Sequence, residues 1–176
     1  MSLTWLEINN ADQYRISNNF TTTSGGIENI LIRFPIDTKD KFSYSLSLEL
    51  LQCTDGFFKC ELSTVQSVES VGTLLGNKRT NKSLPDISRF LAYKGASLTP
   101  KPPPYEPFTF YIGNTLTPVN RFDVHNAEPL GNRIYAGNTD VQLKFTNLDS
   151  TAANLVCSLI VIQSNNSKIN KVRTFK

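Results

Sequence analysis

The sequence predicts an all-β protein, an eight-stranded antiparallel β-sandwich. The clearest observation lies in residues 42–50, where every even position is apolar and every odd position is Ser or Glu. Successive strand side chains point to opposite faces, so this period of two indicates one buried face and one wet face. Similar segments recur to residue 162 with no convincing long helix between them. Abundant Asn, Ser and Thr also favour strands and turns.

Eight strands are expected from Ile27 onward. They lie near residues 27–34, 42–51, 57–65, 87–93, 107–112, 119–124, 141–146 and 155–162. Residues 11–26 are polar and end in a Thr/Ser/Gly stretch, which predicts a loop, and residues 128–137 are expected to form a second long loop. The last expected strand is apolar at nearly every position, which is typical of a central strand covered on both faces.

Two connections carry local signals. Asp55-Gly56 predicts a two-residue turn that returns residues 57–65 antiparallel to residues 42–51. Residues 100–107 hold five prolines. Such a segment is extended, either as a stiff connector between sheets or as a docking peptide for an aromatic groove.

The 176 residues suit one domain that buries roughly 70% of its unfolded surface. We expect an N-terminal segment at 1–26 that packs on the sandwich or on a neighbouring subunit, a domain at 27–163, and a basic tail at 164–176. In the first segment, Trp5 and Tyr14 either cover the sandwich edge or reach a neighbour. The tail is either a solvated end or a contact for nucleic acid, an anionic membrane or an acidic partner, through Lys168, Lys171, Arg173 and Lys176.

No sequence pattern indicates catalysis, a cofactor or a bound metal. The one histidine, His125, shares a strand face with Asp123, but no third ligand follows at a recognisable spacing. Nucleophile-elbow, dinucleotide-binding and phosphate-loop patterns are absent. The aromatic residues of the strands alternate with Ser, Thr and Lys, which favours packing over nucleic-acid stacking; they are Phe42, Tyr44, Phe108, Phe110 and Phe145. We therefore expect no enzyme.

Cysteine usage and hydropathy suggest where the chain is made. Three cysteines are an odd number, and we expect reduced, mostly buried thiols made in a cytosol. The first residues lack the pattern of a secretory signal. No apolar run approaches the ~18 residues that cross a bilayer.

The outline of the chain resembles a viral single jelly-roll capsid protein. The features that carry the resemblance are the strands between Ile27 and Ile162, the proline-rich crossing at 100–107, and the doubly apolar strand 155–162. The resemblance implies a jelly roll and a virion subunit made in the host cytoplasm. It also implies a homo-oligomer, with a pentamer expected, beside neighbouring capsid proteins. Residues 1–26 contain only Arg15 as a basic residue, which favours a penton or minor capsid protein over a genome-packaging one.

Two other functions fit the same pattern. One is a lectin-like or receptor-binding jelly roll. Its site would lie in loops, with aromatic rings to stack on sugar and amides to bond hydroxyls, at Tyr105, Tyr111, Asn114, Tyr135 and Asn138. The other is an intracellular regulatory sandwich, which would neither assemble nor bind sugar.

Overall fold

The fold is known from a computed structural model that describes residues 12–36, 41–54, 56–80, 88–101, 108–113 and 134–165. These residues form twelve β-strands and no helix, so the all-β prediction is confirmed. In this part of the chain no helix has the length and apolar character needed to span a bilayer. The strand expected at 119–124 and His125 lie outside the described residues.

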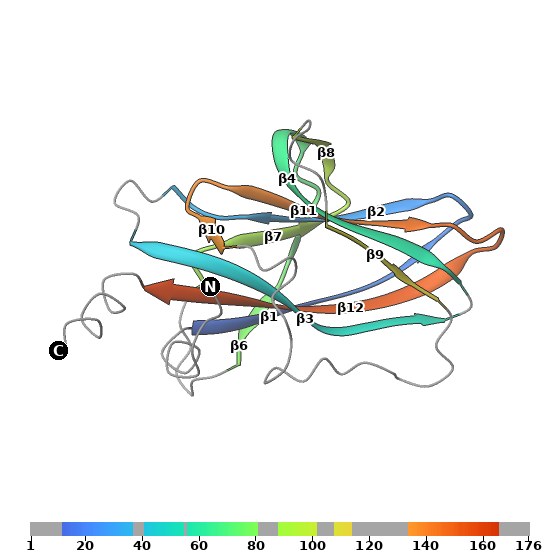
Figure 1. The fold of residues 1–176 in the computed structure, drawn as a ribbon, viewed down its shortest axis with the longest axis horizontal. Coiled ribbons are helices and arrows are strands. Elements are labelled where there is room, and N and C mark those ends of the chain that lie inside the picture. The colour runs from blue at the N-terminus through green and yellow to red at the C-terminus, as the bar shows by residue number, and fades with distance from the viewer. Residues whose placement is uncertain are drawn as a thin grey trace.

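The strands form two antiparallel sheets that pack face to face (Figure 1). The five-stranded sheet contains, in spatial order, β10 (Ile134–Ala136), β3 (Phe42–Thr54), β12 (Ala153–Asn165), β1 (Asp12–Thr22) and β6 (Asn77–Arg79). The seven-stranded sheet contains, in spatial order, β5 (Thr73–Leu75), β7 (Leu91–Lys94), β2 (Ile27–Arg33), β11 (Asp140–Asn147), β4 (Phe58–Ser70) and β8 (Ser97–Pro100), with β9 (Phe108–Ile112) also paired to β4.

The pairing of these strands is nested. With the short strands β5 to β8 set aside, eight strands remain, and the first pairs with the last, β1 with β12. Inside this pair lie β2 with β11, β3 with β10, and β4 with β9. A long hairpin rolled into two layers has this pairing, so the order is compatible with a jelly roll. The predicted antiparallel sandwich is confirmed. Of the four short strands, β7 overlaps the strand expected at 87–93, and β5, β6 and β8 were not predicted.

The prediction of a loop at residues 11–26 is wrong. β1 covers most of this segment and pairs with β12 along its whole length. Its side chains alternate strictly, with Tyr14, Ile16 and Phe20 buried on the inner face. Polar Asn18 and Thr22 occupy the same buried face, and they conceal the apolar period in the sequence. The loop expected at 128–137 also needs correction, because β10 pairs with β3 there.

The hairpin predicted at Asp55-Gly56 is also wrong. β3 and β4 belong to different sheets, so the connection between them crosses from one layer to the other. Gly56 lies against β12, where a Cβ atom would stand only 2.2 Å from the Cβ of Ala153. The glycine is therefore needed for close approach at this crossing, and not for a two-residue turn.

A β-bulge changes the phase of β3. Leu48 pairs with Leu159, whereas Leu50 pairs with Ser158, so Glu49 is an extra residue in the ladder. Tyr44, Leu46 and Leu48 face the core before the bulge, and Leu51 and Cys53 face it afterwards. The apolar residues predicted to face the core do so from Tyr44 to Leu48, but Ser45 and Ser47 are buried as well, so the predicted wet face is wrong here.

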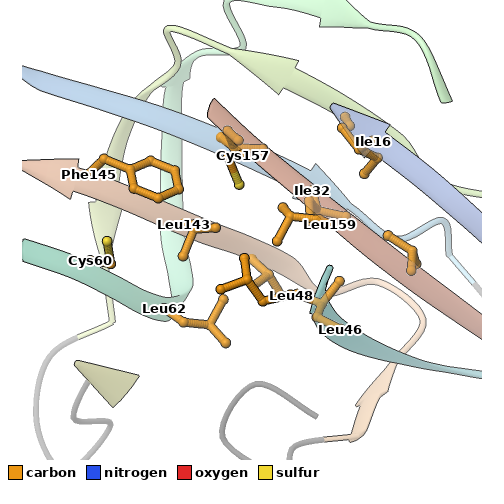
Figure 2. Packing of buried hydrophobic residues seen from close by; sticks show 14 of the residues in the cluster. Ile16, Ile32, Leu46, Leu48, Cys60, Leu62, Leu143, Phe145, Cys157 and Leu159 are labelled. Carbon is orange, nitrogen blue, oxygen red and sulfur yellow. The ribbon is translucent and has the colours of Figure 1, made fainter. Parts of the chain in front are cut away.

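The core lies between the sheets. Figure 2 shows Leu46, Leu48 and Leu159 of the five-stranded sheet near Ile32, Leu62 and Leu143 of the other, and all six belong to one buried cluster. Cys53, Cys60 and Cys157 are all buried and are not joined in a disulfide, so the predicted burial of these thiols is confirmed. Ile160 and Ile162 on the outer face of β12 are buried as well, which confirms that this strand is central and covered on both faces.

Aromatic rings close the core at the end away from the crossing at Gly56. Phe34 stacks on Tyr44 with ring centroids 4.3 Å apart, and it also contacts Tyr135 and Phe90. Of the aromatics assigned to packing, Tyr44 and Phe145 are buried, and Phe42 and Phe110 pack partly buried against the cluster. Phe108 departs from the prediction, because it is 38% exposed at the edge strand β9. Residues 87–93 also differ from expectation, since β7 begins only at Leu91.

The second half of β4 and β8 form a ribbon on the outer face of the seven-stranded sheet (Figure 1). Leu31, Val65 and Ala96 make a small second core beneath it. The Asn29 side chain donates a hydrogen bond to the Ala96 carbonyl at 3.0 Å, and Gln142 donates one to Asn29 at 2.7 Å. This amide chain fastens the ribbon to the sheet.

Candidate functional site

Several charged side chains of the described residues form ion pairs between neighbouring strands. Arg33 donates two hydrogen-bonding arms to Asp140, and this contact raises the pKa of Arg33. Arg79 pairs with Asp12 across β6 and β1. Within the same residues, no group of three or more His, Cys, Asp or Glu side chains is placed to hold a metal ion. These ion pairs link neighbouring strands, and the candidate functional surfaces are formed by other exposed side chains.

Apolar side chains are exposed on edge strands of both sheets, which form two flanks of the sandwich. The β5–β7 flank carries Leu74, 59% exposed, and Leu91, 47% exposed. The β9–β10 flank carries Phe108 on β9 and Ile134 on β10, the latter 57% exposed. β5 and β9 lie at opposite edges of one sheet, and β1 contacts β2 and β5 across the layers. β10 is an edge of the other sheet, and Tyr135 on it contacts Phe34 across the layers.

Asn147 ties the loops at the end of the sandwich where β11 meets β12. Its side chain is fully buried, and its Nδ2 donates to the carbonyls of Thr151 at 2.8 Å and Thr23 at 3.1 Å. Its Oδ1 accepts the Asp149 N–H at 2.9 Å. The next residue, Leu148, donates its N–H to the Phe57 carbonyl at 2.7 Å. The β1–β2, β3–β4 and β11–β12 connections are thus joined by hydrogen bonds at this end.

This loop end presents two stacked aromatic rings. Phe57 and Tyr111 are nearly parallel, at 10°, with ring centroids 5.9 Å apart. They are 42% and 58% exposed. Tyr111 lies opposite Lys59 in the β4–β9 ladder, and Lys59 contacts Glu61 at 2.8 Å. An aromatic surface therefore borders a row of charged side chains on the outer face of the sheet.

The structure separates the residues that the sequence grouped in a loop site. Tyr111 is exposed at the loop end, whereas Tyr135 is 4% exposed and packs on Phe34, so its ring is not free to stack on sugar. Asn138 has a φ of 59° and donates its N–H to the Pro35 carbonyl in a turn at the opposite end. Tyr105 and Asn114 lie outside the described residues.

Of the residues predicted to contact a neighbouring subunit or partner, only Tyr14 lies among the described residues. Tyr14 is 1% exposed and packs edge-on against Phe90, so it caps the core and its ring is not available to a neighbouring subunit. Trp5 and the basic tail residues lie outside the described residues; the tail residues are Lys168, Lys171, Arg173 and Lys176.

Tyr111 at the loop end was predicted as a binding residue, but the exposed residues of the flanks and Phe57 at the loop end were not. One signal was present in the Phe57-Phe58 doublet, because adjacent strand side chains face opposite sides and only one can enter the core. Phe58 is fully buried, and Phe57 is the exposed member.

Comparisons with known proteins leave the family open. No protein-family model matches the chain, and no curated protein matches its sequence. Among solved structures, a Yersinia pseudotuberculosis-derived mitogen has 10% identity and a TM-score of 0.30, over 86% of this chain and 85% of its own. The decameric BFDV capsid protein has 10% identity and a TM-score of 0.18, over 87% and 98%. The 60-mer form of the same capsid protein has 9% identity and a TM-score of 0.17, over 90% and 95%. Scores this low carry no argument about function.

Proposed function

We propose that the chain is a structural virion protein, a single jelly-roll capsid subunit of the penton type that carries out no reaction. The observation that supports it best is the exposure of apolar side chains on both flanks of a two-layered sandwich. Side-by-side packing would bring the β5–β7 flank of one copy against the β9–β10 flank of the next. A contact between two different surfaces repeats head to tail, and it closes into a ring when the rotation allows.

The charges beside the flank suit such a contact. Arg33, which lies opposite Leu91 in the β2–β7 ladder, is already paired with Asp140. Covering Leu91 therefore does not bury an unpaired cation next to it, which would be costly. Apolar contact with a paired polar rim is the usual anatomy of a protein interface.

The expected strength of one contact is low. Complete burial of a large apolar side chain contributes roughly 1.5–3 kcal/mol, so four side chains that are about half exposed contribute roughly 4 kcal/mol together. Association alone costs at least about that much. We therefore expect few free dimers, and we expect assembly to depend on ring closure, with a pentamer as the product, and on neighbouring capsid proteins. The buried reduced thiols fit synthesis in a host cytoplasm.

Cysteine cross-linking tests the head-to-tail contact. The variants Leu74→Cys and Ile134→Cys each place one exposed thiol on one flank, while the native thiols stay buried. Under mild oxidation neither variant alone should dimerise, their mixture should give disulfide-linked dimers, and the double variant should give a ladder that ends in a closed ring. Leu148→Cys at the loop end, paired with Ile134→Cys, is the matched control and should not cross-link.

The outcomes separate the parts of the proposal. Self-dimers of Leu74→Cys alone would show a two-fold contact and refute head-to-tail packing. A chain that stays monomeric by light scattering at high concentration, without any cross-link and without particles in negative-stain images, would refute the structural role itself.

A further inference from the structure

Tyr111 shares strand β9 with Phe108 of the flank, but the two side chains point to opposite faces of the sheet. The stacked rings of Phe57 and Tyr111 are therefore not among the side chains of the proposed subunit contact. Tyr111 points to the outer face of the seven-stranded sheet, in the same cross-strand row as Lys59. Large aromatic rings that stay this exposed are unusual unless something covers them. The pair offers a flat apolar surface one or two rings wide.

Beside the rings lies an ordered row of charge. Lys59 Nζ contacts Glu61 Oε1 at 2.8 Å, and Lys144 Nζ contacts Glu61 Oε2 at 3.6 Å. The hydrogen bond to Glu61 raises the pKa of Lys59, with a further contribution from Tyr111, so Lys59 is fully protonated at neutral pH. Two ammonium groups share one carboxylate, which leaves the row with one excess positive charge.

We propose that this surface, the Tyr111 platform (Phe57, Lys59, Glu61, Tyr111 and Lys144), binds an acidic pyranose, a sialic or uronic acid residue of a glycan. The C–H face of a pyranose packs on an aromatic ring, and its hydroxyls donate to a fixed carboxylate such as Glu61. The carboxylate of the sugar pairs with the ammonium of Lys144, whose side chain is 36% exposed. The ligand thus meets an apolar surface and a small number of convergent polar groups, as is usual for a ligand site.

Other ligand classes fit this surface less well. A nucleic acid needs several cations along a track, and this row has an excess of only one. The platform is also held rigid, because Leu148 donates its N–H to the Phe57 carbonyl and Asn147 fixes the loop that contains Leu148. A preorganised surface loses little conformational entropy when a small ligand binds.

The test is a titration of the full chain with sialyllactose and with neutral lactose, followed by NMR. The expected result is weak binding of sialyllactose, with smaller or no shifts from lactose. Tyr111→Ala should lower the affinity for sialyllactose by about tenfold or more. Lys144→Gln should remove the preference for the acidic sugar. The matched controls Leu74→Ala and Lys78→Gln change an exposed apolar residue and an exposed lysine elsewhere, and they should leave binding unchanged.

Several results would overturn the proposal. No binding of either sugar would do so, as would an equal loss with Lys78→Gln, which would show unspecific attraction to a basic surface. Circular dichroism and thermal unfolding of each variant show that a loss of binding is not a loss of folding. The flank cross-links should be the same in Tyr111→Ala as in the parent chain, so failure of the platform and failure of the assembly role are distinguishable.

Discussion

Replacing Asn147 by alanine is expected to destabilise the fold by about 3–5 kcal/mol. The side chain makes three well-formed hydrogen bonds, at 2.8, 2.9 and 3.1 Å, to Thr151, Asp149 and Thr23. At about 1 kcal/mol net for each bond the loss is about 3 kcal/mol, and it grows because buried partners are left without a hydrogen bond. For a chain of this size, that loss lowers Tm by about 10 °C.

The assay is urea and thermal unfolding followed by far-UV circular dichroism. Asn19→Ala, an exposed asparagine on β1, is the control and should change stability by no more than about 0.5 kcal/mol. A cost below about 1 kcal/mol for Asn147→Ala would refute the idea that this side chain holds the loop end together.

Asn147→Asp tests the hydrogen bonds alone, because it keeps the size and shape of the side chain and removes the N–H donors of its amide group. Its carboxylate would face the carbonyls of Thr23 and Thr151, so its folded-state pKa should lie above the unfolded value of about 3.9. Because the pKa of this carboxyl group is raised in the folded state, the Asn147→Asp variant is most stable below about pH 4. Its stability falls as the pH rises through the folded-state pKa. Stability that does not recover on acidification, measured against the parent chain, would contradict the donor role.

Two further predictions concern the backbone and the thiols. Gly72 has a φ of +77°, and a Cβ atom there would stand 2.1 Å from the Lys94 carbonyl oxygen. Gly72→Ala should therefore lower the free energy of unfolding, measured in urea, by about 2 kcal/mol or more. Gly76→Ala, at a glycine with open space around it, should be nearly neutral, and equal effects of the two substitutions would contradict the close contact. Burial raises the pKa of Cys60 from 9.0 to about 12 and raises that of Cys157 as well. Neither thiol should react with Ellman's reagent at about pH 8 until the chain unfolds. Because unfolded thiols ionise first, stability should fall above about pH 9 by about 1.4 kcal/mol per pH unit for each thiol, and rapid native-state labelling would refute this.

The strands that sequence predicted correctly are those whose apolar residues recur with a local period. In β2, β11 and the first part of β3, every second residue is an apolar side chain in the core, so the period of two marks these strands directly. Burial itself does not alternate there, because Leu31, Ser45, Ser47 and Gln142 on the other face are buried too. β12 is buried on both faces, and its continuous apolar run shows this equally well.

The sequence predictions were wrong at segments whose structure depends on pairing with strands far away in the sequence. β1 carries Asn18 and Thr22 on its buried face, and it is a strand because β12 pairs with it throughout. The Asp55-Gly56 signal is local, but the layer that the next strand joins is set by the pairing of β4 with β11. A bulge at Glu49 is invisible in an alternation that looks regular as far as residue 50.

The candidate surfaces were harder to predict than the fold. Leu74, Leu91 and Ile134 look like core residues in the sequence, and their exposure follows only from the edge positions of β5, β7 and β10. Tyr111 was predicted as a binding residue and is exposed, but Tyr135 from the same group is a core residue. Whether an aromatic residue serves packing or contact depends on the strand order.

The central position of β12 has a consequence for biosynthesis. β1 and β3 both hydrogen-bond to β12, which lies more than a hundred residues later in the chain than β1. Before β12 is translated, β1 can pair only with the short strand β6, and β3 only with the short strand β10, so a product truncated before Ala153 cannot complete that layer. Contacts so distant in sequence make folding slow and leave nascent chains dependent on protection from aggregation. Under the proposed function, only a chain translated through β12 completes the five-stranded sheet that assembly requires.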